Sequence, residues 1–468
     1  MAAVLGIGVS LRDLQSLLPD KTTEVLDHTA ARLVDHGLWV ATDHGWSYRH
    51  DLLREAVYDG IPGDRRQWLH QKVAQWLENH GPYDHGVLAD HFEKGGEPHI
   101  AARHHLLAGR QALRFSLYEV AALHYGRAGA LLRDRPQDPD LLRAQTSYFL
   151  LLRLQRGHST EMAQALDDLE NTCLCQNHRG WHLLAAQYGR WIAENAAKGA
   201  LAGLHQAQNL ANTRYDPEVD PQLVAGVGHY VLGWNDLWLG HLEQAKAHLQ
   251  QAVDGWHEAW AEPLFLAIGD RYREYAMAYL SIIDALQDRP AEGWARLAQV
   301  RHTLPDAKYG NIQAILWAVE IAMGYWADSP EDTWHIAQEV RQRDSYSLII
   351  ARTMTDAFAA WAEARLGYKS IPWAIHHIRR NLNVLRRVWR FGASSIYLVL
   401  LDISVRSGHK HTHGVQFAAR RLVRQHNIDV HKPEIKRLAA MQNKERTGSP
   451  LSRSKKPLRK ASLSKNAL

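Results

Sequence analysis

Apolar residues recur at spacings of three and four along nearly the whole chain up to about residue 425, which predicts a succession of amphipathic helices. Ala, Leu, Gln, Glu and Arg dominate this stretch, and all of them favour helix. One segment departs from the pattern. Two short runs, Trp39–Thr42 and Trp46–Arg49, flank an Asp-His-Gly triplet. They predict a small β-hairpin, because Gly45 tolerates the positive φ of a tight turn.

Four helices are predicted around this hairpin. Ser10 is placed to cap the first, which Pro19 ends, and Thr22 or Thr23 to cap the second. The predicted helices cover residues 10–18, 23–36, 51–58 and 62–80. Helices followed by a two-stranded wing are typical of a winged-helix domain, which we place at residues 1–82.

A repeat follows over residues 83–430. A turn residue is followed five positions later by a small or apolar residue, and nine and twelve positions later by apolar ones, as in Gly240, Ala245, Leu249 and Ala252. A weaker copy of this repeat follows the turn at Gly199 and has the polar residue Gln208 at the ninth position, where an apolar residue is expected. The turns fall at Ser116, Gly157, Gly199 and Gly240, and near Arg289, Ser329 and Gly367. A period near 40 with two helices per unit predicts about seven helical hairpins, similar to tetratricopeptide repeats, stacked into a superhelical solenoid with a concave inner face.

The basic charge of the chain lies at one end. The chain has 55 Lys and Arg against 50 Asp and Glu, for a net charge of +5. Residues 431–468 hold eleven of the basic residues against two Glu, so this segment carries +9 and the rest carries −4. Few apolar residues and many Ser, Pro and Lys predict a disordered basic tail. This tail is expected to bind nucleic acid only non-specifically, because it has no aromatic side chain on which bases could stack.

Three strings support a resemblance to a known family. Residues 46–58 read WSYRHDLLREAVY, a helix rich in Arg, Leu and His follows at 65–74, and residues 88–97 read LADHFEKGGE. They resemble the winged helix that follows the ATPase core of STAND-type bacterial regulators, with its "RHxLLREAxY" string, and the "LAxHxxxAGE" string that opens the family's tetratricopeptide-like repeats. Residues 2–6 match the start of the family's winged helix. The resemblance extends to about residue 135, and beyond that only to the repeat pattern.

The resemblance implies a module of a signal-transduction or transcription-regulating ATPase. With only two cysteines and no membrane-spanning run, the chain is expected to be cytoplasmic. The sequence has no G-x-x-x-x-G-K-[ST] motif, so the ATPase domain is expected on another chain or to be lost. We therefore expect the sensor half of such a regulator, in a split, truncated or mis-started form. By analogy with the family motif, the residues expected to contact a neighbouring domain are Arg49, His50, Asp51, Arg54 and Glu55.

The winged helix is the basis of an alternative function. Its candidate recognition helix, from Thr23 to His36, places Glu24, Asp27 and Asp35 against Arg32, a poor match for DNA phosphates. Packing between domains or an autoinhibitory role, in line with the family, is therefore favoured over DNA binding. A nucleic-acid-binding regulator that uses the winged helix and the basic tail remains the alternative.

Tryptophan is abundant, with 17 in the chain and eleven of them between residues 234 and 389. Most are expected to fill gaps between helices, and a minority to line the concave face and anchor a ligand. Trp234 and Trp238, four residues apart and beside Asn235 and Asp236, are the best candidates to bind a protein partner or a small effector.

No set of residues predicts catalysis. Cys173 and Cys175, with His178 nearby, are too few for a tetrahedral metal site, and His409, His411 and His413 are expected in a solvated loop. No nucleophile–base pair, paired carboxylates, cofactor motif or membrane-spanning run stands out. We expect a non-enzymatic binding module without cofactor or metal.

Overall fold

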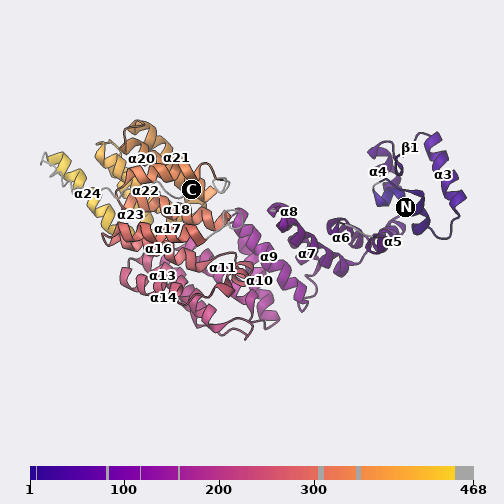
Figure 1. The fold of residues 1–468 in the computed structure, drawn as a ribbon, viewed down its shortest axis with the longest axis horizontal. Coiled ribbons are helices and arrows are strands. Elements are labelled where there is room, and N and C mark those ends of the chain that lie inside the picture. Colours follow the sequence, from indigo (N-terminus) through magenta and orange to yellow (C-terminus); the bar gives the residue numbers. More distant parts are fainter. Residues whose placement is uncertain are drawn as a thin grey trace. The chain divides into compact units, whose positions relative to one another are not determined.

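The computed structural model describes residues 1–447 except residues 7, 81–83, 116, 157–158, 304–309 and 344–348 (Figure 1). The fold is mainly helical, as predicted. Its contacts divide the chain into two compact units. Unit 1 comprises Met1–Arg190, Thr213–Pro221 and Glu262–Gly269, and unit 2 comprises Trp191–Asn212, Gln222–Ala261 and the chain from Asp270 onward.

The predicted hairpin is confirmed. Strands β1 (Trp39–Thr42) and β2 (Gly45–Tyr48) pair antiparallel, with Trp39 opposite Tyr48. Val9 extends this small sheet through two backbone hydrogen bonds of 2.7 and 2.8 Å with Trp46. Gly45 has a φ of +141°, and a Cβ there would lie 2.2 Å from the Val9 carbonyl oxygen, so no other residue fits this turn without strain.

The four helices predicted around the hairpin are also present, and a further short helix at residues 2–5 was not predicted. Ser10 and Asp13 form a reciprocal capping box, and the Thr22 hydroxyl accepts a hydrogen bond from Val25 N–H. Leu14, Leu26, Trp39, Leu69 and Val73 belong to one shared core. The helices of this region are α1 (Ala2–Leu5), α2 (Leu11–Leu17), α3 (Thr23–Asp35), α4 (Asp51–Asp59) and α5 (Gly63–His80).

Helix α6 (His85–Lys94) leads into a series of helical hairpins. The described residues contain eight of them, one more than predicted. They are α7 (Pro98–Arg114) with α8 (Tyr118–Leu131), α9 (Pro139–Arg156) with α10 (Thr160–Cys175), α11 (Trp181–Lys198) with α12 (Ala200–Asn212), α13 (Pro221–Leu239) with α14 (Leu242–Asp254), α16 (Tyr272–Leu286) with α17 (Pro290–Thr303), α18 (Gly310–Trp326) with α19 (Pro330–Val340), α20 (Ile349–Arg365) with α21 (Ile371–Val388), and α22 (Arg390–Arg406) with α23 (Thr412–His426).

The eighth hairpin turns at Gly408, which has a φ of +61°. This turn lies 41 residues after Gly367 and therefore keeps the period. The one irregular interval, from Gly240 to Arg289, is explained by an insertion. A 3₁₀ turn (Glu258–Trp260) and helix α15 (Ala261–Ile268) lie between α14 and α16. The predicted turn residues Ser116 and Gly157 fall outside the described part of the chain.

Small residues let the two helices of a hairpin approach closely. A Cβ on Gly233 would lie 2.8 Å from Leu249 Cγ, and one on Gly109 would lie 2.9 Å from the Tyr125 ring. The predicted Ala245, Leu249 and Ala252 are all buried on α14. These contacts account for the small residues in the repeat.

The predicted phase of α12 is wrong by one residue. Its buried positions are Ala200, Gly203, Ala207 and Leu210, and Gln208 is exposed. Helix α12 starts at Ala200, directly after the turn at Gly199, whereas one residue separates Gly240 from α14. The inward positions therefore come one residue earlier, and the polar side chain points to solvent.

Within unit 2 the first helices of successive hairpins are buried on all sides. Thirteen of the 15 residues of α16 and fifteen of the 17 residues of α22 are buried, which is the pattern of interior helices. Helices α16, α18, α20 and α22 pack in sequence (Figure 1). Phe391 of α22 in turn contacts Trp234 and Trp238 of α13, at 5.1 and 5.2 Å between ring centroids. The inner face of these hairpins is thus filled by its own side chains.

The predicted disordered tail begins too early. After a 3₁₀ turn (Asp429–His431), helix α24 (Lys432–Thr447) packs against α22 and α23. Ile435 and Leu438, three residues apart, are 2% and 0% exposed. This apolar stripe covers the last hairpin, and its burial offsets the entropy of ordering the basic residues around it. Residues 448–468 lie outside the described part.

Candidate partner-binding groove

A groove of about 710 Å³ lies in unit 1 on the first helices of three successive hairpins. Its lining residues come from α7, α9, the start of α11 and the facing side of α8, and helix α15 forms another wall. Arg153 of α9 holds α15 in place, since its guanidinium donates a 2.6 Å hydrogen bond to the Ile268 carbonyl. The groove thus lies on the first helices of the hairpins, and stacked hairpins commonly offer their partners a continuous surface of this kind.

The groove is basic. Arg103 and Arg110 lie two turns apart on α7, and Arg143 lies on α9. Asp140 is the acidic residue among the lining side chains, and it contacts Arg143 at 3.0 Å and Arg103 at 3.8 Å. The side chains of Arg103 and Arg143 are still 76% and 67% exposed. One carboxylate cannot neutralise three guanidinium groups, so the groove carries an excess of positive charge.

Apolar side chains lie between these charges. Leu107 is 41% exposed and Leu266, on α15, is 66% exposed. His182 adds no charge near neutral pH, because burial and the nearby His178 and Arg143 lower its pKa to about 4. It forms a 2.8 Å hydrogen bond with the Thr146 hydroxyl. An extended segment with acidic and apolar side chains would complement this surface.

The residues predicted to bind a partner lie elsewhere, inside unit 2. Trp234 and Trp238 are only 6% and 8% exposed. The Trp234 ring packs edge-on against Trp191, Tyr279 and Phe391. The structure thus gives Trp234 the gap-filling role, while Trp238 lines a small apolar cavity.

Asn235 is completely buried in a hydrogen-bond network. Its carbonyl oxygen accepts from Trp191 Nε1 at 2.6 Å, and its amide nitrogen donates to Asn195 Oδ1 at 2.9 Å and to the Ala200 carbonyl at 2.7 Å. Asp236, 8% exposed, accepts from His241 Nδ1 at 3.1 Å. Asn235 offers no surface to a partner. The sequence made Asn235 a candidate because a polar residue next to a tryptophan can belong either to a binding site or to a buried hydrogen-bond network, and the sequence does not distinguish the two.

The five residues expected to contact a neighbouring domain lie at and after the hairpin. Arg49, His50, Asp51 and Glu55 are exposed, and Arg54 is half-buried. They flank or belong to α4, which has no buried residue at all. Leu52 is 77% exposed on the same helix. Val57 is also exposed, so α4 presents two large apolar side chains to solvent.

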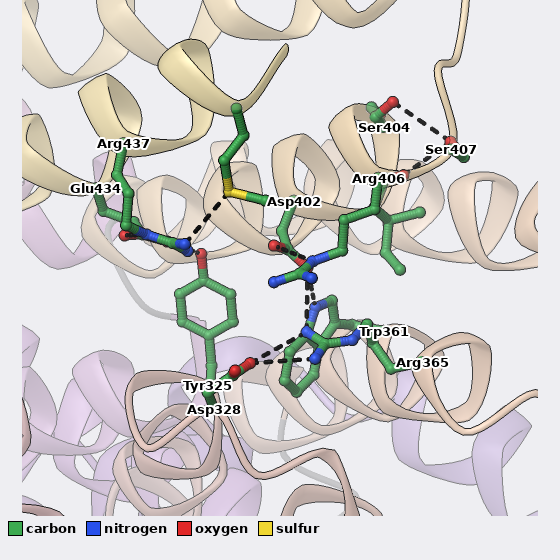
Figure 2. Close-up of polar contacts among 12 residues, drawn as sticks. Tyr325, Asp328, Trp361, Arg365, Asp402, Ser404, Arg406, Ser407, Glu434 and Arg437 are labelled. Atoms are coloured by element: carbon green, nitrogen blue, oxygen red, sulfur yellow. Dashed lines mark hydrogen bonds and ion pairs between the residues drawn. The ribbon is translucent and has the colours of Figure 1, made fainter. Parts of the chain in front are cut away.

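A polar network joins the turn ends of α18, α20 and α22 to helix α24 in unit 2 (Figure 2). Asp402, 1% exposed, accepts from Trp361 Nε1 and Arg406 Nε at 2.8 Å each. The Tyr325 hydroxyl donates to Glu434 at 2.8 Å, and burial raises its pKa. A pocket of about 570 Å³ lies beside these groups. The paired charges give the network a structural role, in which it fixes α24 to the last hairpins.

The other residues considered for chemistry lie apart. Cys173 is buried and Cys175 exposed on α10, and His409 and His411 lie in the turn before α23. Among the described residues no group of three or more His, Cys, Asp or Glu is arranged to hold a metal ion. Across the same part of the chain, no helix is long and apolar enough to cross a membrane.

The basic groove was missed at the sequence level. Arg103 and Arg110 are seven residues apart, a spacing that places both on one face of a helix, so the sequence could have predicted this part of the basic surface. Arg143 lies on another hairpin, and α15 comes from residues more than 100 positions later. Their meeting with α7 depends on the tertiary structure.

Comparison with known proteins assigns the chain neither a family nor a function. No protein-family model matches the chain. A protein of Rhizobium meliloti (strain 1021), named only as uncharacterized protein R02095, is 31% identical over 119 residues. The match covers 24% of this chain and 12% of that protein, so the chain spans a small part of its relative's length.

Proposed function

We propose that this chain is a non-enzymatic binding module whose groove in unit 1 holds an extended, acidic segment of a partner protein. The observation that carries the proposal is the set of three arginines on the first helices of two neighbouring hairpins, with a single aspartate among them that contacts two of the three. Exposed arginine beside apolar surface is a frequent composition of binding hot spots. The groove is also long enough, across three hairpins, for several residues of an extended peptide.

The N-terminal region provides a second contact surface in this proposal. The order of helices and hairpin in residues 1–80 fits a winged helix, and the hairpins that follow fit tetratricopeptide-like repeats. In STAND-type regulators, the family that the sequence resembles, such a module acts with an ATPase. We infer that α4, with exposed Leu52 and Glu55 and half-buried Arg54, contacts an ATPase domain supplied by another cytoplasmic chain.

The groove is tested with fluorescein-labelled peptides of equal length. One alternates glutamate with leucine, and the other alternates lysine with leucine. Fluorescence anisotropy at about 0.1 M salt should show binding of the acidic peptide only. The double substitution Arg103→Glu with Arg143→Glu should weaken binding at least tenfold, because it reverses the charge of the groove.

The matched control is Arg133→Glu, an exposed arginine of unit 1 that does not line the groove. It should leave the affinity within about twofold. Equal binding of both peptides, or equal loss with both sets of substitutions, would contradict the groove as the site.

Two further measurements separate this proposal from its alternatives. The purified chain should release no phosphate from ATP above a buffer blank, and hydrolysis would overturn the non-enzymatic role. Duplex DNA should bind, if at all, only through residues 448–468, because α3 exposes Glu24, Asp27 and Asp35. A loss of DNA binding with Arg32→Glu in a chain without residues 448–468 would favour the nucleic-acid-binding regulator instead.

A further inference from the structure

Helices α21 and α23 of unit 2 carry a set of exposed arginines. They are the second helices of the last two hairpins, and both pack against α22. Neither helix contains an Asp, Glu or Lys. Seven arginines lie on them and all are exposed, namely Arg379, Arg380, Arg386 and Arg387 on α21 and Arg420, Arg421 and Arg424 on α23.

The charge of these arginines is not neutralised by their surroundings. Within the described part of the chain none of the seven forms an ion pair, whereas Arg406 of α22 pairs with Asp402 at 2.8 Å. Residues 370–430 hold ten Lys and Arg against two Asp, for a net charge of +8, and residues 1–369 carry −12. Helix α19, the second helix of the preceding hairpin, has three acidic residues and no Lys or Arg. The positive charge is therefore concentrated on α21–α23 and is not a general feature of the repeat.

The arginines follow one another along the helices. On α21, Arg379 and Arg386 are two turns apart, as are Arg380 and Arg387, which corresponds to about 10.5 Å along the helix axis. Arg379 also lies near the turn before α23, since it adds to the effect of burial in lowering the pKa of His409. The basic surface of α21 thus continues toward α23. Nucleic acid gains affinity from such a surface, because several neighbouring phosphates release their counter-ions together.

An exposed aromatic ring lies among the arginines of α23. Phe417 is 69% exposed, and Arg421 and Arg424 follow it at four and seven residues, a spacing that places all three on one face of the helix. Any nucleic-acid base can stack on an aromatic ring, provided that the base is not already stacked within a duplex. Phe417 therefore favours a single strand over a duplex.

The packing of the two helices argues against a lipid surface or a protein as the partner. Their apolar side chains are buried within unit 2, and Ile378, Leu385 and Val423 are at most 3% exposed. In the described parts of α21 and α23, Phe417 is the one large apolar side chain that is exposed. An amphipathic helix needs a free apolar face to enter a membrane, and the centre of a protein interface is usually apolar.

We propose that α21 and α23 bind single-stranded nucleic acid, with their arginines on the phosphates and a base stacked on Phe417. The surface lies in unit 2 and does not depend on the groove of unit 1.

The full chain is tested with a fluorescein-labelled oligodeoxythymidine of about 15 nucleotides, by fluorescence anisotropy at about 0.1 M salt. The matched control is the same strand in a duplex with oligodeoxyadenosine, which should bind at least fivefold more weakly because its bases are not free to stack. The glutamate–leucine peptide used for the groove of unit 1 should not displace the oligonucleotide. Displacement by this peptide, or equal affinity for the duplex, would overturn the proposal.

The arginines are tested with two variants that each lower the net charge by four. The surface variant combines Arg386→Gln, Arg387→Gln, Arg421→Gln and Arg424→Gln. The tail variant combines Lys455→Gln, Lys456→Gln, Arg459→Gln and Lys460→Gln. The surface variant should bind at least tenfold more weakly and its affinity should depend less steeply on salt, whereas the tail variant should stay within about threefold of the wild type. An equal loss in the tail variant would show non-specific binding by the tail and would overturn the proposal.

The stacking contact is tested with Phe417→Leu, which leaves every charge in place. It should weaken binding about fivefold or more, and Phe115→Leu, at a position in unit 1 that is also 69% exposed, should not change it. Unchanged binding in either the surface variant or Phe417→Leu would overturn the proposal. Vesicles that contain phosphatidylserine test for a lipid surface. If the surface variant weakens binding to the vesicles and not to the oligonucleotide, α21 and α23 bind lipid and the proposal is wrong.

Discussion

Replacement of Asn235 by leucine distinguishes a structural residue from a binding residue. The two side chains are similar in size, but leucine can form none of the three hydrogen bonds that Asn235 makes with Trp191, Asn195 and Ala200. The substitution therefore leaves polar groups in the buried centre of unit 2 without this partner. At about 1–2 kcal/mol for each of the three interactions, the expected loss is about 3–6 kcal/mol.

The assay is thermal unfolding of the full chain, with hydrogen exchange to locate the effect. At about 2–4 °C per kcal/mol, a loss of that size should lower the midpoint of the unit 2 transition by roughly 6–24 °C. Peptides from α11–α13 should exchange faster, while peptides from α6–α8 in unit 1 should not. Asn209→Leu, at an exposed position of α12, is the matched control and should shift the midpoint by less than about 2 °C.

A double-mutant cycle isolates the shortest of these hydrogen bonds. Trp191→Phe removes the N–H that Asn235 accepts, so the combination with Asn235→Leu should cost less than the sum of the two single substitutions by about 1 kcal/mol or more. An unchanged midpoint in Asn235→Leu together with weaker partner binding would refute the structural role and restore Asn235 as a binding residue.

Three further predictions concern pH, the hairpin and the thiols. The buried pair His70 and His91 lies with its Nδ1 atoms 2.9 Å apart, and burial lowers the pKa of His70 to about 4 and that of His91 in the same direction. The unfolded state binds protons more readily than the folded state, so the stability of unit 1 should be constant above about pH 6.5 and fall between pH 6.5 and 4. A melting temperature that does not change over this pH range would contradict this prediction. So would a melting temperature that falls with pH as steeply in the double variant His70→Phe with His91→Leu as in the wild type. Gly45→Ala should destabilise the N-terminal region by about 2–3 kcal/mol, because its Cβ would lie against Val9, as measured by urea unfolding; Gly63→Ala, where nothing lies within 4 Å, is the control and should be neutral or slightly stabilising. Ellman's reagent should modify exposed Cys175 quickly and Cys173 only on unfolding, because burial raises the pKa of the Cys173 thiol to about 12. If the Cys175→Ser variant still reacts quickly, Cys173 is accessible and α10 opens readily.

The local signals in the sequence were reliable where one residue determines the geometry. Ser10 and Thr22 cap helices because their side-chain oxygens satisfy N–H groups one turn away, and Gly45 marks a turn that only glycine fits. The 40-residue period gave seven of the eight hairpins because each turn ends one helix and starts the next. The eighth, at Gly408, has the same signal and was predictable by extending the period.

The errors arose where distant segments determine the outcome. Lys432–Thr447 was included in the tail whose composition predicted disorder, but Ile435 and Leu438 are buried where α24 packs on the last hairpin. Trp234 and Asn235 have the composition of a binding site, but Phe391 and Trp191 bury them. Neither partner can be recognised from the local sequence, since each lies more than 40 residues away.

The sequence by itself determined the helical class, the hairpin near residue 45 and the repeat of about 40 residues. These follow from hydrophobic periodicity and from turn residues, which act over a few positions along the chain. Only the tertiary structure decided which inward face is filled and which is open. In unit 2 the first helices of the hairpins bury one another, whereas in unit 1 Arg103, Arg110 and Arg143 line an open groove beside α15. The physical reason is that burial depends on which surfaces meet, and the period of the repeat is the same in both units.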